Sequence, residues 1–133
     1  MRIFLFIIVA GLFFGCSTES REYQKAADAE EAGREFIRAS LDGNYEKAKF
    51  YLYQDSSNTN LTLLERWRAD YNLLPQEDKI SYKEANIIAL SILPENDSTV
   101  NYTYSNSFKR KDTTTLKIIR VNGEWLVDFK DLH

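Results

Sequence analysis

Few side chains in this sequence could carry out acid–base chemistry. Asp70, beside Tyr71, is the carboxylate best suited to act as a general base, with a tyrosine hydroxyl as the donor to developing negative charge. Asp70 also follows Arg66 by four residues, the spacing of an ordinary ion pair on the outer face of a helix. The only histidine, His133, is the last residue, where chain ends fray. The sequence therefore favours a protein that is not an enzyme, with Asp70 as the one catalytic candidate.

A set of aromatic residues could instead form the wall of a binding pocket. Their rings supply apolar surface and their polar tips could orient a small apolar ligand. The other interpretation, which we favour, is that they fill the core with the tyrosine hydroxyls reaching the surface. The candidates are Trp67, Tyr71, Tyr82, Tyr102, Tyr104 and Trp125.

The sequence predicts no metal site and no cofactor. One histidine and one cysteine leave carboxylates as the remaining ligands, and these do not have the spacing of a calcium-binding loop. There is no glycine-rich phosphate-binding loop and no nucleophile elbow of the form Gly-x-Ser-x-Gly. With 17 basic and 20 acidic residues, the formal net charge is −3. This balance, without a basic stripe, argues against a nucleic-acid partner.

The N-terminus has the pattern of a secretory signal peptide. Arg2 precedes an apolar stretch, residues 3–14, that is too short to cross a bilayer as a helix. Small and polar residues follow it. A buried core helix is the alternative, but this stretch is apolar on every face and the chain is too small to cover all of them.

Phe13-Phe14-Gly15-Cys16 resembles a bacterial lipobox. The resemblance implies cleavage after Gly15 and lipidation of the thiol of Cys16, the only cysteine in the chain. Acyl chains on that residue would hold the protein to a membrane. Ser17 after the cysteine favours the outer membrane of a bacterial envelope. We thus expect a signal peptide at 1–15, a lipidated cysteine and tether at 16–22, and one domain at 23–133.

The first half of the domain has the apolar spacing of helices. The pattern predicts a helix over 23–42 ending at Gly43, and a short second helix capped by Asn44. After a polar loop at 55–60, a third helix is expected to open at the capping box Thr62-x-x-Glu65 and to end before Pro75.

The second half alternates apolar and polar residues, which indicates strands. We expect these at 81–93, where Pro94 stops the first, and at 100–105, 113–121 and 125–129. Asn122-Gly123 predicts a tight hairpin between the last two. Helices followed by a meandering antiparallel sheet define an α+β fold, with the helices packed on one face of about four strands.

Two segments resemble nuclear-transport-factor-2-like domains, which share a cone-shaped fold with ketosteroid isomerase. They are Leu41-Asp42-Gly43-Asn44-Tyr45-Glu46-Lys47-Ala48 and the terminal Val121-Asn122-Gly123-Glu124-Trp125-Leu126-Val127-Asp128-Phe129. The resemblance implies a curved sheet wrapped around helices, with a pocket at the wide end. It is greatest to small envelope lipoproteins without an assigned function.

These observations predict a lipid-anchored envelope protein that acts as a non-enzymatic binding or interaction module. Its partner would be another envelope protein, a second copy of itself or a small apolar ligand, and a protein partner is favoured because no convergent polar groups mark a ligand site. The alternative is a pocket enzyme that acts on a small hydrophobic substrate by general acid–base catalysis.

Overall fold

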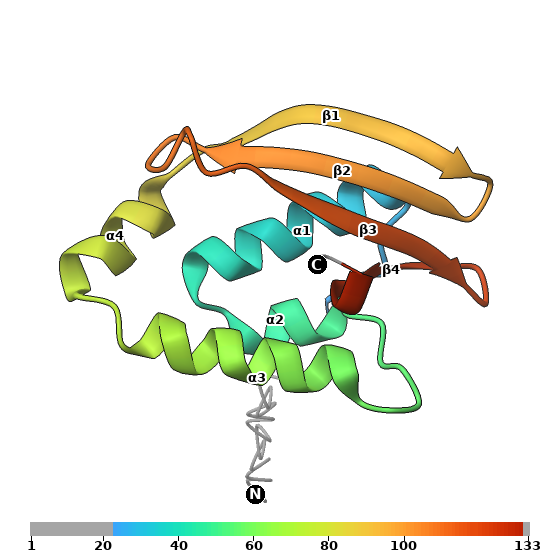
Figure 1. The fold of residues 1–133 in the computed structure, drawn as a ribbon, viewed down its shortest axis with the longest axis horizontal. Helices are drawn as coiled ribbons and strands as arrows, with labels where there is room; N and C mark the ends of the chain where they lie inside the picture. The colour runs from blue at the N-terminus through green and yellow to red at the C-terminus, as the bar shows by residue number, and fades with distance from the viewer. Residues whose placement is uncertain (1–22, 132–133) are drawn as a thin grey trace, which may run out of the picture.

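Four helices lie on one side of a four-stranded antiparallel sheet (Figure 1). The computed structural model describes residues 23–131. The strand order is β1-β2-β3-β4, so each strand pairs with its neighbour in sequence. The α+β architecture predicted from the sequence is confirmed. The elements are α1 (Ala29–Asp42), α2 (Tyr45–Phe50), α3 (Thr59–Asn72), α4 (Gln76–Glu84), β1 (Ile87–Asn96), β2 (Thr99–Asn106), β3 (Thr114–Val121), β4 (Glu124–Asp128) and a final 3₁₀ turn (Phe129–Asp131).

Helix α1 is the centre of the core. It begins at Ala29 rather than at residue 23, because the Asp28 side chain accepts the backbone N–H of Glu31 (2.8 Å) and caps the first turn. Gly33 lets it approach the sheet closely, since a Cβ there would lie 2.7 Å from Ile118 Cδ1. Its buried stripe packs against β2, β3 and β4 through residues that include Phe36, Ile37, Tyr102, Leu116, Ile118 and Val127.

The turn between α1 and α2 forms as the sequence predicts. Gly43 adopts a left-handed conformation (φ 70°), and Asn44 caps α2 by accepting the backbone N–H of Lys47 (3.1 Å). Gly43 has little free space, because a Cβ there would lie 2.4 Å from the ring of Tyr71 on α3. The turn therefore fixes the distance between α1 and α3.

Helix α3 begins three residues before the predicted capping box. The Asp55 carboxylate accepts the backbone N–H groups of Thr59 (3.1 Å) and Asn60 (2.9 Å), so the cap comes from the preceding loop. Thr62 lies inside the helix and donates to the Asn58 carbonyl instead. The prediction of the helix start at Thr62 was wrong because the capping side chain is four residues before the helix and not adjacent to it.

Helix α4 was not predicted, and the strand expected at 81–93 begins only at Ile87. Pro75 ends one helix and also precedes the next, and the first turn of α4 carries Glu77 and Asp78, which favour a helix N-terminus. No residue of α4 is buried, so its sequence lacks an apolar stripe that periodicity could detect. Strand β1 also ends later than predicted. It continues through Pro94 to Asn96, because an edge strand tolerates proline.

The last two strands form the predicted hairpin, and Asn122 (φ 51°) and Gly123 (φ 78°) both have the positive φ that its turn requires. All core residues of the described chain lie between Ala29 and Val127, so the domain closes around its own core. Within the described residues, no helix is long and apolar enough to cross a membrane. The predicted signal peptide, Cys16 and His133 lie outside the described residues.

Candidate functional site

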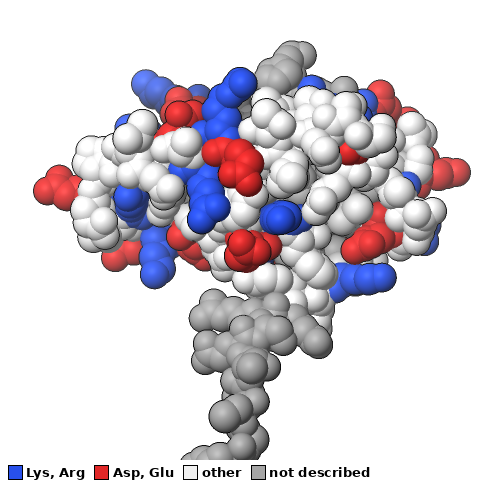
Figure 2. Space-filling view, turned by 90° about the horizontal axis from the view of Figure 1, so that it is seen from below, with Lys and Arg blue, Asp and Glu red and all other residues white. Residues whose placement is uncertain are grey.

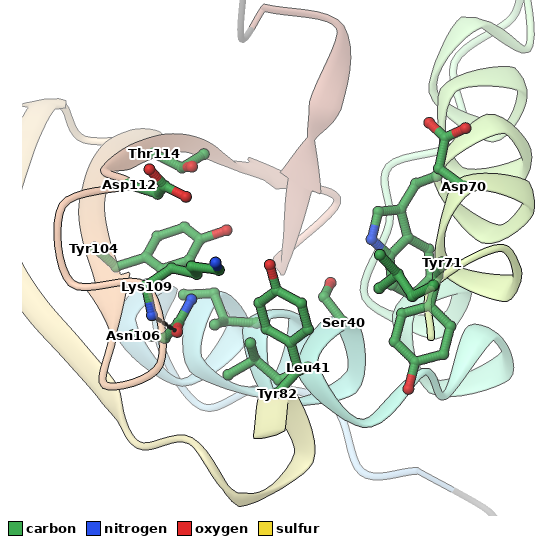
Figure 3. A pocket seen from close by; sticks show the side chains of 13 residues that line it. Ser40, Leu41, Asp70, Tyr71, Tyr82, Tyr104, Asn106, Lys109, Asp112 and Thr114 are labelled. Atoms are coloured by element: carbon green, nitrogen blue, oxygen red, sulfur yellow. Dashed lines mark hydrogen bonds between the residues drawn. The ribbon is translucent and has the colours of Figure 1, made fainter. Parts of the chain in front are cut away.

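A cavity of about 310 Å³ opens where the C-terminal turn of α1 meets α3, α4 and the loop between β2 and β3 (Figure 3). This volume is at the lower end of the range for small-molecule sites and is sufficient for one or two fused rings. Its walls combine apolar and polar side chains. They are Ile37, Ser40, Leu41, Trp67, Asp70, Tyr71, Leu74, Tyr82, Tyr104, Asn106, Lys109, Asp112 and Thr114.

The helices supply the apolar wall. Trp67 and Tyr71 lie one turn apart on α3, with their ring centroids 5.6 Å apart, and Leu74 continues this surface beyond the helix end. Ile37 and Leu41 of α1 form the floor and are themselves buried in the core. A flat apolar ligand could therefore stack against α3 and rest on α1.

Hydroxyl groups come from the other side of the cavity. In Figure 3 the hydroxyls of Tyr82, Tyr104 and Ser40 point toward the space between the elements. Burial raises the pKa of the Tyr104 phenol to about 12, and its hydrogen bond with Thr114 acts weakly in the opposite direction. Tyr104 is therefore a neutral phenol at ordinary pH, able to donate to or accept from an uncharged polar group of a ligand.

The loop after β2 is held in shape by Asn106. Its side-chain oxygen accepts the backbone N–H groups of Phe108 (3.0 Å) and Lys109 (2.8 Å), and the second bond is drawn in Figure 3. Phe108 then packs edge-on against Tyr82, with ring centroids 4.9 Å apart. Asn106 therefore positions both the Lys109 side of the cavity and, through Phe108, the tyrosine of α4.

Helix α4 is attached to α1 mainly through Arg38. The guanidinium donates to the carbonyls of Ala85 (2.7 Å), Lys83 (2.9 Å) and Tyr82 (3.3 Å) at the C-terminus of α4. It also forms an ion pair with Asp42 (3.0 Å). A cation suits the carbonyls at a helix C-terminus and the negative end of the helix dipole. Arg38 thus fixes the wall that carries Tyr82.

Asp70 does not meet the cavity hydroxyls. It is exposed on α3, and in Figure 3 its carboxylate points away from Tyr82 and Tyr104. Asp112, the other carboxylate of the lining, is also exposed. Neither carboxylate of the described lining is therefore buried. The described residues also contain no cluster of side chains suited to hold a metal ion.

The structure places the six aromatic candidates in two groups. Trp67, Tyr71, Tyr82 and Tyr104 line the cavity. Tyr102 is only 2 % exposed and lies in the core under Gly33, and Trp125 packs on the core at the other end of the sheet, with Arg120 5.8 Å above its ring.

Sequence reasoning did not identify the polar residues of the site. Arg38, Ser40 and Lys109 do not stand out in the sequence by residue type or spacing. Asn106 directly before a turn was the one available signal, because asparagine often accepts nearby backbone N–H groups there.

A second buried polar cluster joins the loop before α3 to the end of β4. The side chain of fully buried Asn60 donates to the Tyr53 carbonyl (2.8 Å) and to Asp128 (2.9 Å), and its oxygen accepts the backbone N–H of Lys130 (2.6 Å). Its hydrogen-bonding groups are thus occupied within the fold. This cluster is structural and keeps α3 against the sheet.

The helical side of the molecule carries both charge signs. Figure 2 shows Lys and Arg interspersed with Asp and Glu over this face. Such mixing gives no extended field of one sign to attract a polyanion.

Comparison with known proteins identifies the fold. No protein-family model matches the chain, and no curated protein matches it either. The structure is similar to that of an NTF-2-like protein of unknown function from Shewanella oneidensis MR-1, with a TM-score of 0.52 and 16 % sequence identity. The match covers 74 % of this chain and 89 % of that one. The domain therefore has an NTF2-like fold, as its two sequence segments suggested, and the similarity assigns no activity.

Proposed function

We propose that this protein is a lipid-anchored component of a bacterial envelope whose NTF2-like domain binds a small apolar ligand. The cavity beside Trp67 is the observation that carries this proposal. The sequence alone favours a protein partner, because it shows no convergent polar groups. The hydroxyls of Tyr82 and Tyr104 on one side of an apolar space supply such groups and favour a ligand.

The ligand that fits this chemistry is a compact ring compound with one or two uncharged polar groups. Its rings would lie against Trp67 and Leu74, and its polar group would meet Tyr104 or Tyr82. Binding rather than catalysis is proposed, because Asp70 is exposed and points away from these hydroxyls. The variant Asp70→Asn should therefore leave the affinity for such a ligand unchanged.

A calorimetric titration tests this proposal with 2-naphthol as the probe and the domain from residue 17 to residue 133. Leu74→Trp should fill the cavity and abolish binding. Leu73→Trp is the matched control, because the neighbouring Leu73 is 83 % exposed and does not line the cavity. Equal binding of 2-naphthol to both variants, or no binding to the unaltered domain, would refute the cavity as the site.

The anchor is tested separately. Cys16→Ser in the full chain should abolish metabolic labelling with an alkyne-tagged fatty acid and remove the protein from the membrane fraction. Ser17→Ala is the control, since it leaves the cysteine in place. Lipid labelling that persists in Cys16→Ser would show that the lipobox assignment is wrong, without affecting the cavity.

A further inference from the structure

The edge strand β1 is long, apolar and paired on one side only. It lies at one end of the strand order, and no described segment continues the sheet beyond it (Figure 1). From Ile87 to Pro94 it has no charged residue, and Leu90 and Leu93 are 53 % and 63 % exposed. Proteins usually protect such an edge with charged side chains. In the described strand, protection comes from a bulge between Ala89 and Ser91, and from Pro94, Glu95 and a second irregularity between Pro94 and Asn96 near its end.

We propose that β1 pairs antiparallel with β1 of a second copy of this chain, which joins two sheets into one of eight strands. The two-fold axis passes between Leu90 and Ser91. This assembly uses the sheet edge and leaves the cavity beside Trp67 accessible, so it is independent of ligand binding.

The pairing of β1 with β2 shows which peptide groups of β1 point toward β2 and which point outward. The N–H of Ser107 donates to the Asn86 carbonyl (2.9 Å), so the peptide groups of Asn86 and Ile88 face β2 and those of Ile87 and Ala89 face outward. The same alternation along β2 directs Ser105, Thr103 and Asn101 toward β1.

Beyond the bulge, Ser91 and Leu93 lie opposite Thr103 and Asn101 and therefore face β2. Ile92 and Pro94 then face outward. This is the position in which the missing N–H of a proline removes no hydrogen bond from the existing sheet.

The alternation of inward-facing and outward-facing peptide groups along β1 is compatible with one symmetric register. Outward-facing Ala89 pairs with Ile92 of the second copy through two hydrogen bonds. Outward-facing Ile87 pairs with its Pro94 through one, because proline has no N–H and can only accept. Ile88 then lies opposite Leu93 of the second copy, on the sheet face away from the core, as their partners Ser105 and Asn101 on β2 indicate.

A second copy fits this edge because the stretch is complementary to itself. In the register above, each pair from Ile87 to Pro94 brings together two uncharged residues, and at least one is apolar. The next pair places Asn86 opposite Glu95, so no two like charges meet directly. A strand pair of this length buries less than the ~1,200 Å² of a standard interface, so we expect a weak, concentration-dependent dimer.

Sedimentation velocity of the 17–133 domain, from low micromolar to near-millimolar concentration, tests the association. We expect a monomer–dimer equilibrium in the unaltered domain and in Leu73→Lys, which adds the same charge at the corner between α3 and α4. Leu93→Lys should remain monomeric, and circular dichroism checks that it is folded. A monomer at every concentration, or a dimer that survives Leu93→Lys, would overturn the proposal.

Disulfide trapping tests the register. The domain lacks Cys16, so the double variant Ile88→Cys/Leu93→Cys carries only the two introduced thiols. Within one strand these positions are roughly 16 Å apart, too far for a disulfide, so oxidation should give a covalent dimer. The control Ala89→Cys/Leu93→Cys should stay monomeric, because those two positions are not opposite each other. Equal cross-linking of both variants would contradict the register.

Discussion

The contact between Arg38 and the C-terminus of α4 leads to a quantitative prediction. Arg38→Ala removes a donor from the carbonyls of Tyr82, Lys83 and Ala85. Those of Lys83 and Ala85 are left to water, whereas that of Tyr82 keeps the backbone N–H of Ala85. A net hydrogen bond contributes about 1 kcal/mol, so three bonds from a partly exposed side chain stabilise the docked helix by about 2–3 kcal/mol. Helix α4 has no fully buried residue, and its other main contact is the packing of Tyr82 on Phe108. We expect α4 to open locally before the domain unfolds.

Hydrogen exchange monitored by NMR measures this opening directly. In Arg38→Ala, exchange of the α4 amides should accelerate by about 30- to 150-fold, the equivalent of 2–3 kcal/mol, whereas the amides of α1 and the sheet remain protected. Arg34→Ala is the control, because Arg34 is an exposed arginine one turn earlier on α1. Arg38→Lys should be intermediate, since lysine keeps the charge but not the planar fork. Unchanged α4 protection in Arg38→Ala would refute the role of this contact.

Two further predictions concern the polar contacts at the start of α3. Asn60→Ala leaves the Tyr53 carbonyl, the Lys130 N–H and the Asp128 carboxylate without their partner. Urea denaturation should show that this variant lowers the free energy of unfolding by about 3 kcal/mol. The control Asn72→Ala, at the exposed end of α3, should change the free energy of unfolding little. The backbone N–H groups of Thr59 and Asn60 lower the pKa of Asp55 to about 2, so its contribution to stability is present above pH 4 and is lost as the pH falls toward 2. Acid titration of Asp55→Asn should lack this loss, and an identical acid transition in both proteins would contradict the assignment.

The parts of the fold with strong local signals could be predicted from the sequence. The α1–α2 turn and the β3–β4 hairpin each combine a glycine at positive φ with apolar residues of clear periodicity on both sides. Helix α4 could not be found in this way. It is stabilised by acidic residues in its first turn, by Arg38 from another helix and by the packing of Tyr82 on Phe108. None of these produces an apolar stripe.

The cavity shows a different limit of sequence reasoning. Tyr102 and Tyr104 are two residues apart on β2 and share one face of the sheet, with ring centroids 6.2 Å apart. Alternation alone therefore assigns them the same role, yet Tyr102 lies in the core under Gly33 and Tyr104 lines the cavity. What separates them is the position of α1. Gly33 of this helix packs on the ring of Tyr102, whereas Ser40 and Leu41 of its last turn line the cavity together with Tyr104.

Beyond that last turn, the side chains of α3 and α4 leave the space near Tyr104 unfilled. The length of α1 thus determines which aromatic residues pack in the core and which are accessible to a ligand. If this explanation is correct, binding of 2-naphthol should respond to changes at Tyr104 and be insensitive to conservative changes at Trp125. Tyr104→Phe should weaken the affinity by the loss of one hydrogen bond, about 1 kcal/mol or roughly fivefold, whereas Trp125→Phe should leave it unchanged. Calorimetry on both variants would decide, and a larger effect at Trp125 than at Tyr104 would place the ligand elsewhere on the sheet.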